Sequence, residues 1–88
     1  MIEIVYITQR HCGLCEFFRP TIQRICSENG WEYQEKDTST IMPVVIEKEI
    51  TQTPAILVYV GNEYRGKIEG VKRKETISKL IRKMASHL

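Results

Sequence analysis

The chain has 88 residues, of which 42% are hydrophobic and 27% are charged, and its formal net charge is +2. This length and composition are typical of one globular domain with a modest core, so we expect residues 1–88 to form a single domain. The small charge argues against nucleic acid or an anionic membrane as a partner, and the longest apolar run, Ala55–Val60, is far shorter than the roughly 20 residues of a membrane span.

The cysteine count and the N-terminus bear on the compartment. Three cysteines are an odd number, which suits a reducing compartment better than a secreted disulfide scaffold. The first residues, MIEIVYIT, have neither the basic start nor the cleavage site of a signal peptide. We therefore expect a soluble, cytoplasmic protein.

The first half of the chain predicts a strand, a long helix and a second strand. Ile2–Ile7 is β-branched, aromatic and mostly apolar, as in a strand that is covered on both faces. From Cys12 to Asn29-Gly30 the sequence predicts a helix, because apolar residues recur at spacings of three and four: Cys15, Phe18, Ile22, Ile25 and Cys26. Trp31–Asp37 follows as the next strand, parallel to the first because a helix connects them.

The second half predicts a short helix, a hairpin and a final helix. Ser39 or Thr40 would cap the short helix, with Pro43 in its first turn. Its buried residues would be Ile41, Val44 and Val45. Ala55–Val60 and Glu63–Glu69 are strands joined by the turn pair Gly61-Asn62. After Gly70 the sequence predicts a last helix whose apolar face points into the core, with Ile77, Leu80, Ile81, Met84 and Leu88.

The predicted order of elements is β-α-β-α-β-β-α, which places the chain in the α/β class. A four-stranded mixed sheet with helices on both faces would cover every apolar stripe. We expect that architecture.

Cys12 and Cys15 are separated by two residues and lie where the first strand gives way to a helix. In a βαβ unit this position is typical of a redox-active pair. The unpaired N–H groups and the dipole at a helix N-terminus favour the thiolate, which is the nucleophilic form of cysteine. We therefore expect Cys12, at the tip, to attack a substrate disulfide, and Cys15, one turn later and facing inward, to resolve the mixed disulfide.

Metal binding and simple burial are the alternative uses of such a pair. A tetrahedral zinc site needs further ligands, and the candidates are His11, Cys26 and His87. Cys26 follows Cys15 by eleven residues in the same helix. The two are therefore about 16 Å apart and cannot share one site. We expect no metal site, and we expect Cys26 to be a buried core residue.

These motifs together resemble the thioredoxin superfamily over nearly the whole chain. Cys12-Gly13-Leu14-Cys15 is similar to the Cys-Gly-Pro-Cys centre of thioredoxins, and Pro20 stands where they carry a proline inside the active-site helix. Thr53-Pro54 matches their cis-proline beside the dithiol, and Gly61-Asn62 and Gly70 match the hairpin turn and the glycine beyond it. The resemblance implies a minimal thioredoxin fold, since the chain starts at the strand before the dithiol and has the length of a glutaredoxin.

The resemblance also implies the parts of the site. Its centre would be a redox-active Cys12–Cys15 disulfide with no bound cofactor. Pro54 would shape the substrate groove, and Thr53 would offer backbone hydrogen bonds to an extended substrate. The residues implied to contact the substrate are Thr53, Pro54, His11, Gly13, Leu14 and Gly70.

Besides Leu14, which replaces the proline of the Cys-Gly-Pro-Cys centre, two substitutions depart from the thioredoxin pattern. Tyr6 stands where thioredoxins have a buried aspartate, so an aspartate that would help to deprotonate Cys15 is missing, and we interpret Tyr6 as structural. His11 replaces the usual tryptophan before the first cysteine, and as a cation it would further stabilise the Cys12 thiolate.

Three functions stay open at this point. The first is an enzyme that reduces protein disulfides, with electrons from a thioredoxin reductase or from glutathione. A glutathione-dependent, glutaredoxin-like version would lack the Gly-Gly and acidic residue with which glutaredoxins hold glutathione, since Glu69-Gly70-Val71-Lys72 stands there instead, but Arg10 or Lys72 would offer cationic contacts. The second is a redox-fold module that binds a partner protein, and the third is a cysteine-ligated metal or cluster protein assembled between two chains. We expect the first, as a monomer.

Overall fold

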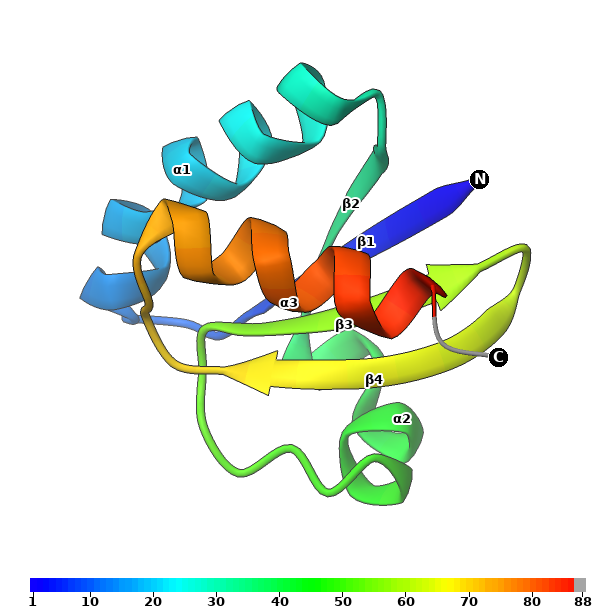
Figure 1. The fold of residues 1–88 in the computed structure, drawn as a ribbon. Coiled ribbons are helices and arrows are strands. Elements are labelled where there is room, and N and C mark those ends of the chain that lie inside the picture. The colour runs from blue at the N-terminus through cyan, green and yellow to red at the C-terminus, as the bar shows by residue number, and fades with distance from the viewer. Residues whose placement is uncertain (87–88) are drawn as a thin grey trace.

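The computed structural model describes residues 1–86, and the elements in this part of the chain follow the predicted order. They are β1 (Ile2–Thr8), α1 (Gly13–Asn29), β2 (Glu32–Asp37), α2 (Met42–Glu47), β3 (Ala55–Val60), β4 (Glu63–Glu69) and α3 (Lys74–Ser86), with a 3₁₀ turn at Thr38–Thr40. The strands form one four-stranded sheet in the order β2-β1-β3-β4 (Figure 1). The predicted α/β class and element order are confirmed.

Strand β1 sets the directions of the other strands. It is parallel to β2 and antiparallel to β3, and β3 forms a hairpin with β4. Helix α1 connects the two parallel strands, as a parallel pair requires. Because Ile7 near the end of β1 pairs with Ala55 at the start of β3, the N-terminus of α1 and the loop before β3 meet at one edge of the sheet.

The main core lies between the sheet and the helices α1 and α3, which cover the same face (Figure 1). Its buried residues are Ile4, Tyr6, Phe18, Ile22, Ile25, Cys26, Ile56, Val58, Ile68, Ile77 and Ile81. The predicted inward stripe of α1 is therefore confirmed. In α3 the residues Ile77 and Ile81 are buried, Leu80 and Met84 are half-buried against this core, and the predicted position of Leu88 lies outside the described residues, as does His87.

A smaller core occupies the opposite face, under α2 (Figure 1). It consists of Ile7, Ala55 and Leu57. The predicted burial of Ile41, Val44 and Val45 is only partly right, since all three are half-buried. The reason is that α2 has six residues and covers only part of this face.

The predicted cap of the short helix is wrong. Helix α2 has Ile41 as its N-cap residue, without a side-chain cap, although Pro43 lies in its first turn as predicted. Ser39 and Thr40, the two expected caps, instead form hydrogen bonds with Asp37 in the preceding 3₁₀ turn. The carboxylate of Asp37 accepts hydrogen bonds from the backbone N–H and the hydroxyl of Ser39, and the Asp37 carbonyl oxygen accepts one from the Thr40 hydroxyl. These side chains therefore bond within the local Asx turn and not to the N-terminus of α2.

Truncating a residue of the main core should cost far more than truncating the same residue type at the surface. Ile77 is fully buried, so Ile77→Ala is expected to lower the free energy of unfolding by about 2–5 kcal/mol through lost burial and a cavity. Ile46 on α2 is 69% exposed, and Ile46→Ala should change the same quantity by less than about 0.5 kcal/mol. Urea unfolding of the oxidised proteins measures both, and equal losses would contradict this assignment of the core.

Candidate active site

Cys12 is the residue that begins α1. It is the N-cap, in extended conformation, and its sulfur accepts a hydrogen bond from the backbone N–H of Cys15 over 3.1 Å. The two sulfurs are joined in a disulfide, with their Cα atoms 5.2 Å apart. A sulfur at this point lies among the unpaired N–H groups of the first helical turn, which favour negative charge. The helix start therefore provides an electrostatic environment suited to a thiolate.

The two cysteines differ sharply in exposure. Cys15 is fully buried, whereas Cys12 is half-buried at the surface. Of the two, Cys12 is therefore the one that the sulfur of another molecule can reach. Cys15 lies behind it and is joined to it through the disulfide. This asymmetry is what a two-step exchange through a mixed disulfide requires.

Tyr6 lies beneath the dithiol and holds the backbone of Cys15. Its hydroxyl donates a hydrogen bond of 2.8 Å to the carbonyl oxygen of Cys15, and its ring packs 6.4 Å from that of Phe18 and 6.2 Å from that of Tyr33, measured between ring centres. Burial raises the pKa of Tyr6 to about 12, with Arg19 opposing the rise, so the hydroxyl keeps its proton and remains a donor. Its contact with a carbonyl rather than with a sulfur supports a structural role.

The loop before β3 brings the predicted substrate residues to Cys12. The Thr53-Pro54 peptide bond is cis, and the Thr53 hydroxyl lies 3.7 Å from the Cys12 sulfur. Pro54 is buried, and its carbonyl oxygen accepts a hydrogen bond of 2.8 Å from the N–H of Gly70. Residues that are far apart in the sequence therefore converge on the dithiol: Cys12, Thr53, Pro54 and Gly70.

The other predicted substrate residues lie on the surface around the cysteines. His11, Gly13 and Leu14 are all exposed, and His11 has a φ of 56°, a left-handed conformation in the turn that leads into α1. Leu14 is 58% exposed and Phe17, one turn further along α1, is 73% exposed. The surface beside Cys12 on α1 is therefore apolar.

Sequence reasoning missed Glu69, the last residue of β4. One of its carboxylate oxygens accepts hydrogen bonds from the N–H and hydroxyl of Thr51 and from the N–H of Gln52, and the other lies 2.9 Å from the Nζ atom of Lys67. Burial would raise the pKa of Glu69, but the bonds from Lys67 and Thr51 outweigh it and lower the pKa to about 2. The signal in the sequence, an acidic residue directly before Gly70, does not reveal which loop it contacts.

A second charged cluster, also missed, ties α1 to β2. Arg19 forms paired hydrogen bonds of 2.6–3.0 Å with the carboxylates of both Glu16 and Glu35, and Tyr33 donates to Glu35. The bonds from Arg19 lower the pKa of both carboxyl groups. Because Glu16 follows Cys15 directly, this cluster helps to fix the first turns of α1 against the sheet.

Cys26 is not part of the site. It is 2% exposed in the main core, as predicted, and burial raises the pKa of its thiol to about 11. Among residues 1–86, no three His, Cys, Asp or Glu side chains are grouped so as to hold a metal ion. None of the described helices has the length and apolar character needed to cross a membrane.

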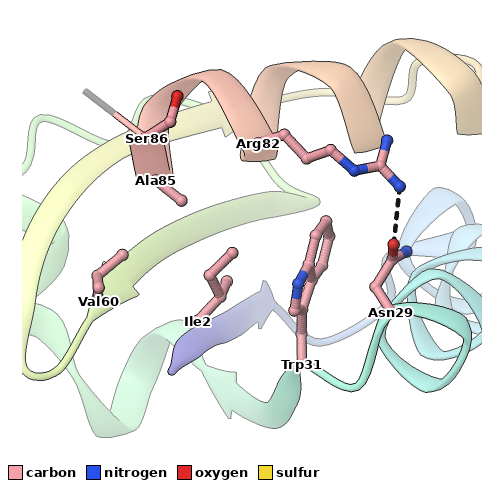
Figure 2. A pocket seen from close by; sticks show the side chains of 7 residues that line it. All are labelled: Ile2, Asn29, Trp31, Val60, Arg82, Ala85 and Ser86. Carbon is pink, nitrogen blue, oxygen red and sulfur yellow. Dashed lines mark hydrogen bonds between the residues drawn. The ribbon is translucent and has the colours of Figure 1, made fainter.

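A shallow pocket of about 360 Å³ lies at the opposite end of the sheet, where β1 begins and α3 ends (Figure 2). Arg82 lies over the ring of Trp31 and donates a hydrogen bond of 2.7 Å to the side-chain oxygen of Asn29 (Figure 2). None of the predicted site residues lines this pocket, whose walls are Ile2, Asn29, Trp31, Val60, Arg82, Ala85 and Ser86. This pocket is therefore separate from the candidate active site at the dithiol end.

Removing the Tyr6 hydroxyl should weaken the support of the dithiol. Tyr6→Phe is expected to lower the free energy of unfolding by about 0.5–1.5 kcal/mol, because it deletes one buried hydrogen bond to Cys15. The control is Tyr33→Phe, which removes an exposed bond to Glu35 and should cost less than about 0.5 kcal/mol. Both are measured by urea unfolding, and an equal or larger loss in Tyr33→Phe would contradict the role given to Tyr6.

The charge of Glu69 should make stability depend on pH in acid. Its pKa is about 2 in the folded chain and near 4.5 when unperturbed, so its contribution is complete above about pH 4.5 and is lost as the pH falls toward 2. This fall in pKa sets an upper limit of about 3.5 kcal/mol on the contribution of Glu69 to stability, at about 1.4 kcal/mol per pKa unit. The advantage of wild type over Glu69→Gln in urea unfolding should therefore shrink between pH 5 and pH 2. A difference that stays constant over this range would refute the assignment.

Comparisons with known proteins agree with this geometry. The family model Thioredoxin matches residues 2–83. No curated protein matches the sequence significantly. Among solved structures, the chain is similar to a mutant thioredoxin from Halobacterium salinarum, with a TM-score of 0.82 and 11% identity over 99% of this chain and 77% of that one.

Two further thioredoxin structures are similar. Thioredoxin 1 from Thermosipho africanus has a TM-score of 0.76 and 15% identity, over 92% of this chain and 91% of that one. Mitochondrial thioredoxin 3 from Saccharomyces cerevisiae, in its oxidised form, has a TM-score of 0.79 and 18% identity, over 93% of this chain and 77% of that one. At such identities the likeness to these structures establishes a shared fold. The family match over residues 2–83 goes further, and with it the chain belongs to the thioredoxin family.

Proposed function

We propose that this chain reduces protein disulfides by dithiol–disulfide exchange through Cys12 and Cys15. The observation that carries the proposal is the unequal exposure of a bonded cysteine pair at a helix N-terminus, with Cys12 accessible and Cys15 fully buried. An accessible sulfur can attack a substrate, while a buried partner sulfur is kept from unrelated reactions until a mixed disulfide forms beside it.

The reaction begins with the reduced pair. The Cys12 thiolate attacks one sulfur of the substrate disulfide, which forms a mixed disulfide and releases the other substrate sulfur as a thiolate. Cys15 then gives up its proton and attacks the Cys12 sulfur, which forms the Cys12–Cys15 bond and releases the second substrate sulfur. Two electrons have passed from the pair to the substrate, and an external reductant restores the dithiol.

The surface around Cys12 supports a polypeptide as the substrate. The exposed apolar side chains of Leu14 and Phe17 offer a dry contact area, and the Thr53 backbone beside Cys12 offers hydrogen bonds to an extended segment. In this proposal His11, Gly13 and Gly70 border the same contact area, and Pro54 shapes its floor.

Two reductants fit the dithiol, a thioredoxin reductase and glutathione. The family favours the first. The second is an alternative in which Arg10 or Lys72 contacts a glutathione carboxylate. We therefore propose the reaction that depends on thioredoxin reductase. We also propose a reducing compartment such as the cytoplasm, because one of the three cysteines is buried and forms no disulfide.

The proposal is tested by the reduction of insulin disulfides, coupled to thioredoxin reductase with NADPH or to glutathione with its own reductase. Wild type should turn over with the thioredoxin reductase, whereas Cys12→Ser should be inactive because the nucleophile is lost. Cys15→Ser should stop after one step and accumulate a mixed disulfide with insulin, which mass spectrometry detects. Cys26→Ala, which removes the buried core cysteine, is the control and should keep the wild-type rate.

The outcomes of this experiment separate the alternatives. Lack of turnover in wild type with both reductants would rule out the enzyme and leave a partner-binding module. Turnover with glutathione alone, retained in Cys15→Ser, would replace the dithiol mechanism by a monothiol, glutaredoxin-like one.

A further inference from the structure

The carboxylate of Glu69 spans the gap between the end of β4 and the loop that leads to Pro54. One oxygen accepts three hydrogen bonds, at 3.0 Å and 2.9 Å from the N–H and hydroxyl of Thr51 and at 3.1 Å from the N–H of Gln52. Its side chain is only 15% exposed. Because these two N–H groups belong to no strand or helix, Glu69 supplies the acceptor that regular structure would otherwise provide.

Lys67 braces the same loop at its other end. It lies two residues before Glu69 on β4, so both side chains leave the same face of the strand. Its Nζ atom is 2.9 Å from Glu69 and donates hydrogen bonds to the carbonyl oxygens of Lys48 and Glu49. Glu49 has a left-handed φ of 52°, so the chain turns sharply at the point that Lys67 holds. The pair therefore fastens the loop where it leaves α2 and again just before Thr53.

The next residue in the loop is the one beside the nucleophile. Thr53 follows Gln52 directly, and its hydroxyl lies 3.7 Å from the Cys12 sulfur. On its other side Pro54 is held by the N–H of Gly70, the residue after Glu69. Thr53 is thus fixed from both directions by the end of β4, and this half-buried residue borders the place where a substrate would lie.

We infer that Glu69 is a positioning residue for protein substrates, which acts by holding the loop 51–53 so that Thr53 presents its backbone beside Cys12. The inference rests on the proposed function and extends it to how an extended polypeptide is bound. The competing explanation is that Glu69 merely stabilises the edge strand through its ion pair with Lys67. The two explanations differ in what they predict for substrate affinity.

The strand provides a matched control for Glu69. Glu63, at the other end of β4, also pairs with a cation two residues away, since its carboxylate lies 2.7 Å from Arg65. This pair lies beside the turn Gly61-Asn62, away from the dithiol end. Removing either carboxylate deletes an ion pair of β4, but of the two only Glu69 contacts the loop.

The experiment compares Glu69→Ala, Glu69→Gln and Glu63→Ala in insulin reduction, in the reaction of the dithiol with a small aromatic disulfide, and in amide hydrogen exchange. For Glu69→Ala we expect the KM for insulin to rise up to roughly tenfold, the size expected when the substrate loses one hydrogen bond to the Thr53 backbone, while the rate with the small disulfide is unchanged. The amides of Thr51 and Gln52 should exchange faster. Glu69→Gln keeps an acceptor oxygen, so its KM should rise less than that of Glu69→Ala. Glu63→Ala should keep the wild-type KM.

The outcomes can be told apart. If wild type is active and Glu69→Gln and Glu69→Ala both keep the wild-type KM, the inference is wrong while the proposed function stands. A similar rise of KM in Glu63→Ala would also overturn it, since general weakening of β4 would then suffice. If wild type reduces no protein disulfide, the proposed function fails, and the inference fails with it. If Glu69→Ala does not fold, the KM of Glu69→Gln alone provides the test.

Discussion

The junction between β1 and α1 is the constraint on which the rest of the site depends. A buried strand ends at Thr8, the chain turns through a left-handed residue at His11, and a helix begins with a sulfur as its cap. This order places one sulfur at the positive end of α1 and the next one a turn deeper in the core. Tyr6 beneath Cys15 and the Arg19 cluster on the outer side of α1 both hold this junction in place.

The loop before β3 completes the site from the other side. It approaches Cys12 because β3 runs antiparallel to β1, so that the start of one strand lies beside the end of the other. The hairpin partner β4 then supplies Glu69 and Lys67 to the same loop, and Gly70, directly after β4, adds a further hydrogen bond. The topology therefore brings distant segments to the dithiol, and short polar contacts fix their final positions.

Much of the fold and of the site could be predicted from the sequence, because it depends on local patterns. The apolar spacing in α1, the glycine after Asn29 and the turn pair Gly61-Asn62 each act within a few residues. Glu69 and Tyr6 could not be placed in this way, since their partners are 18 and 9 residues away and the geometry that joins them exists only after folding. The cap of α2 was missed for a different reason, because Asp37 and the helix start compete for the same hydroxyl groups.

The neutral hydroxyl of Tyr6 has a consequence for the protons of the exchange reaction. Within residues 1–86, no acidic side chain is buried, so the interior beneath Cys15 offers no base that could store a proton between the two steps. In the reaction proposed above, the proton of Cys15 has to leave past Cys12, where the departing sulfur of the substrate is itself a base. In the proposed reaction the molecule that takes up the electrons therefore also takes up the proton, because the acceptor of the proton comes from the substrate and not from the protein interior.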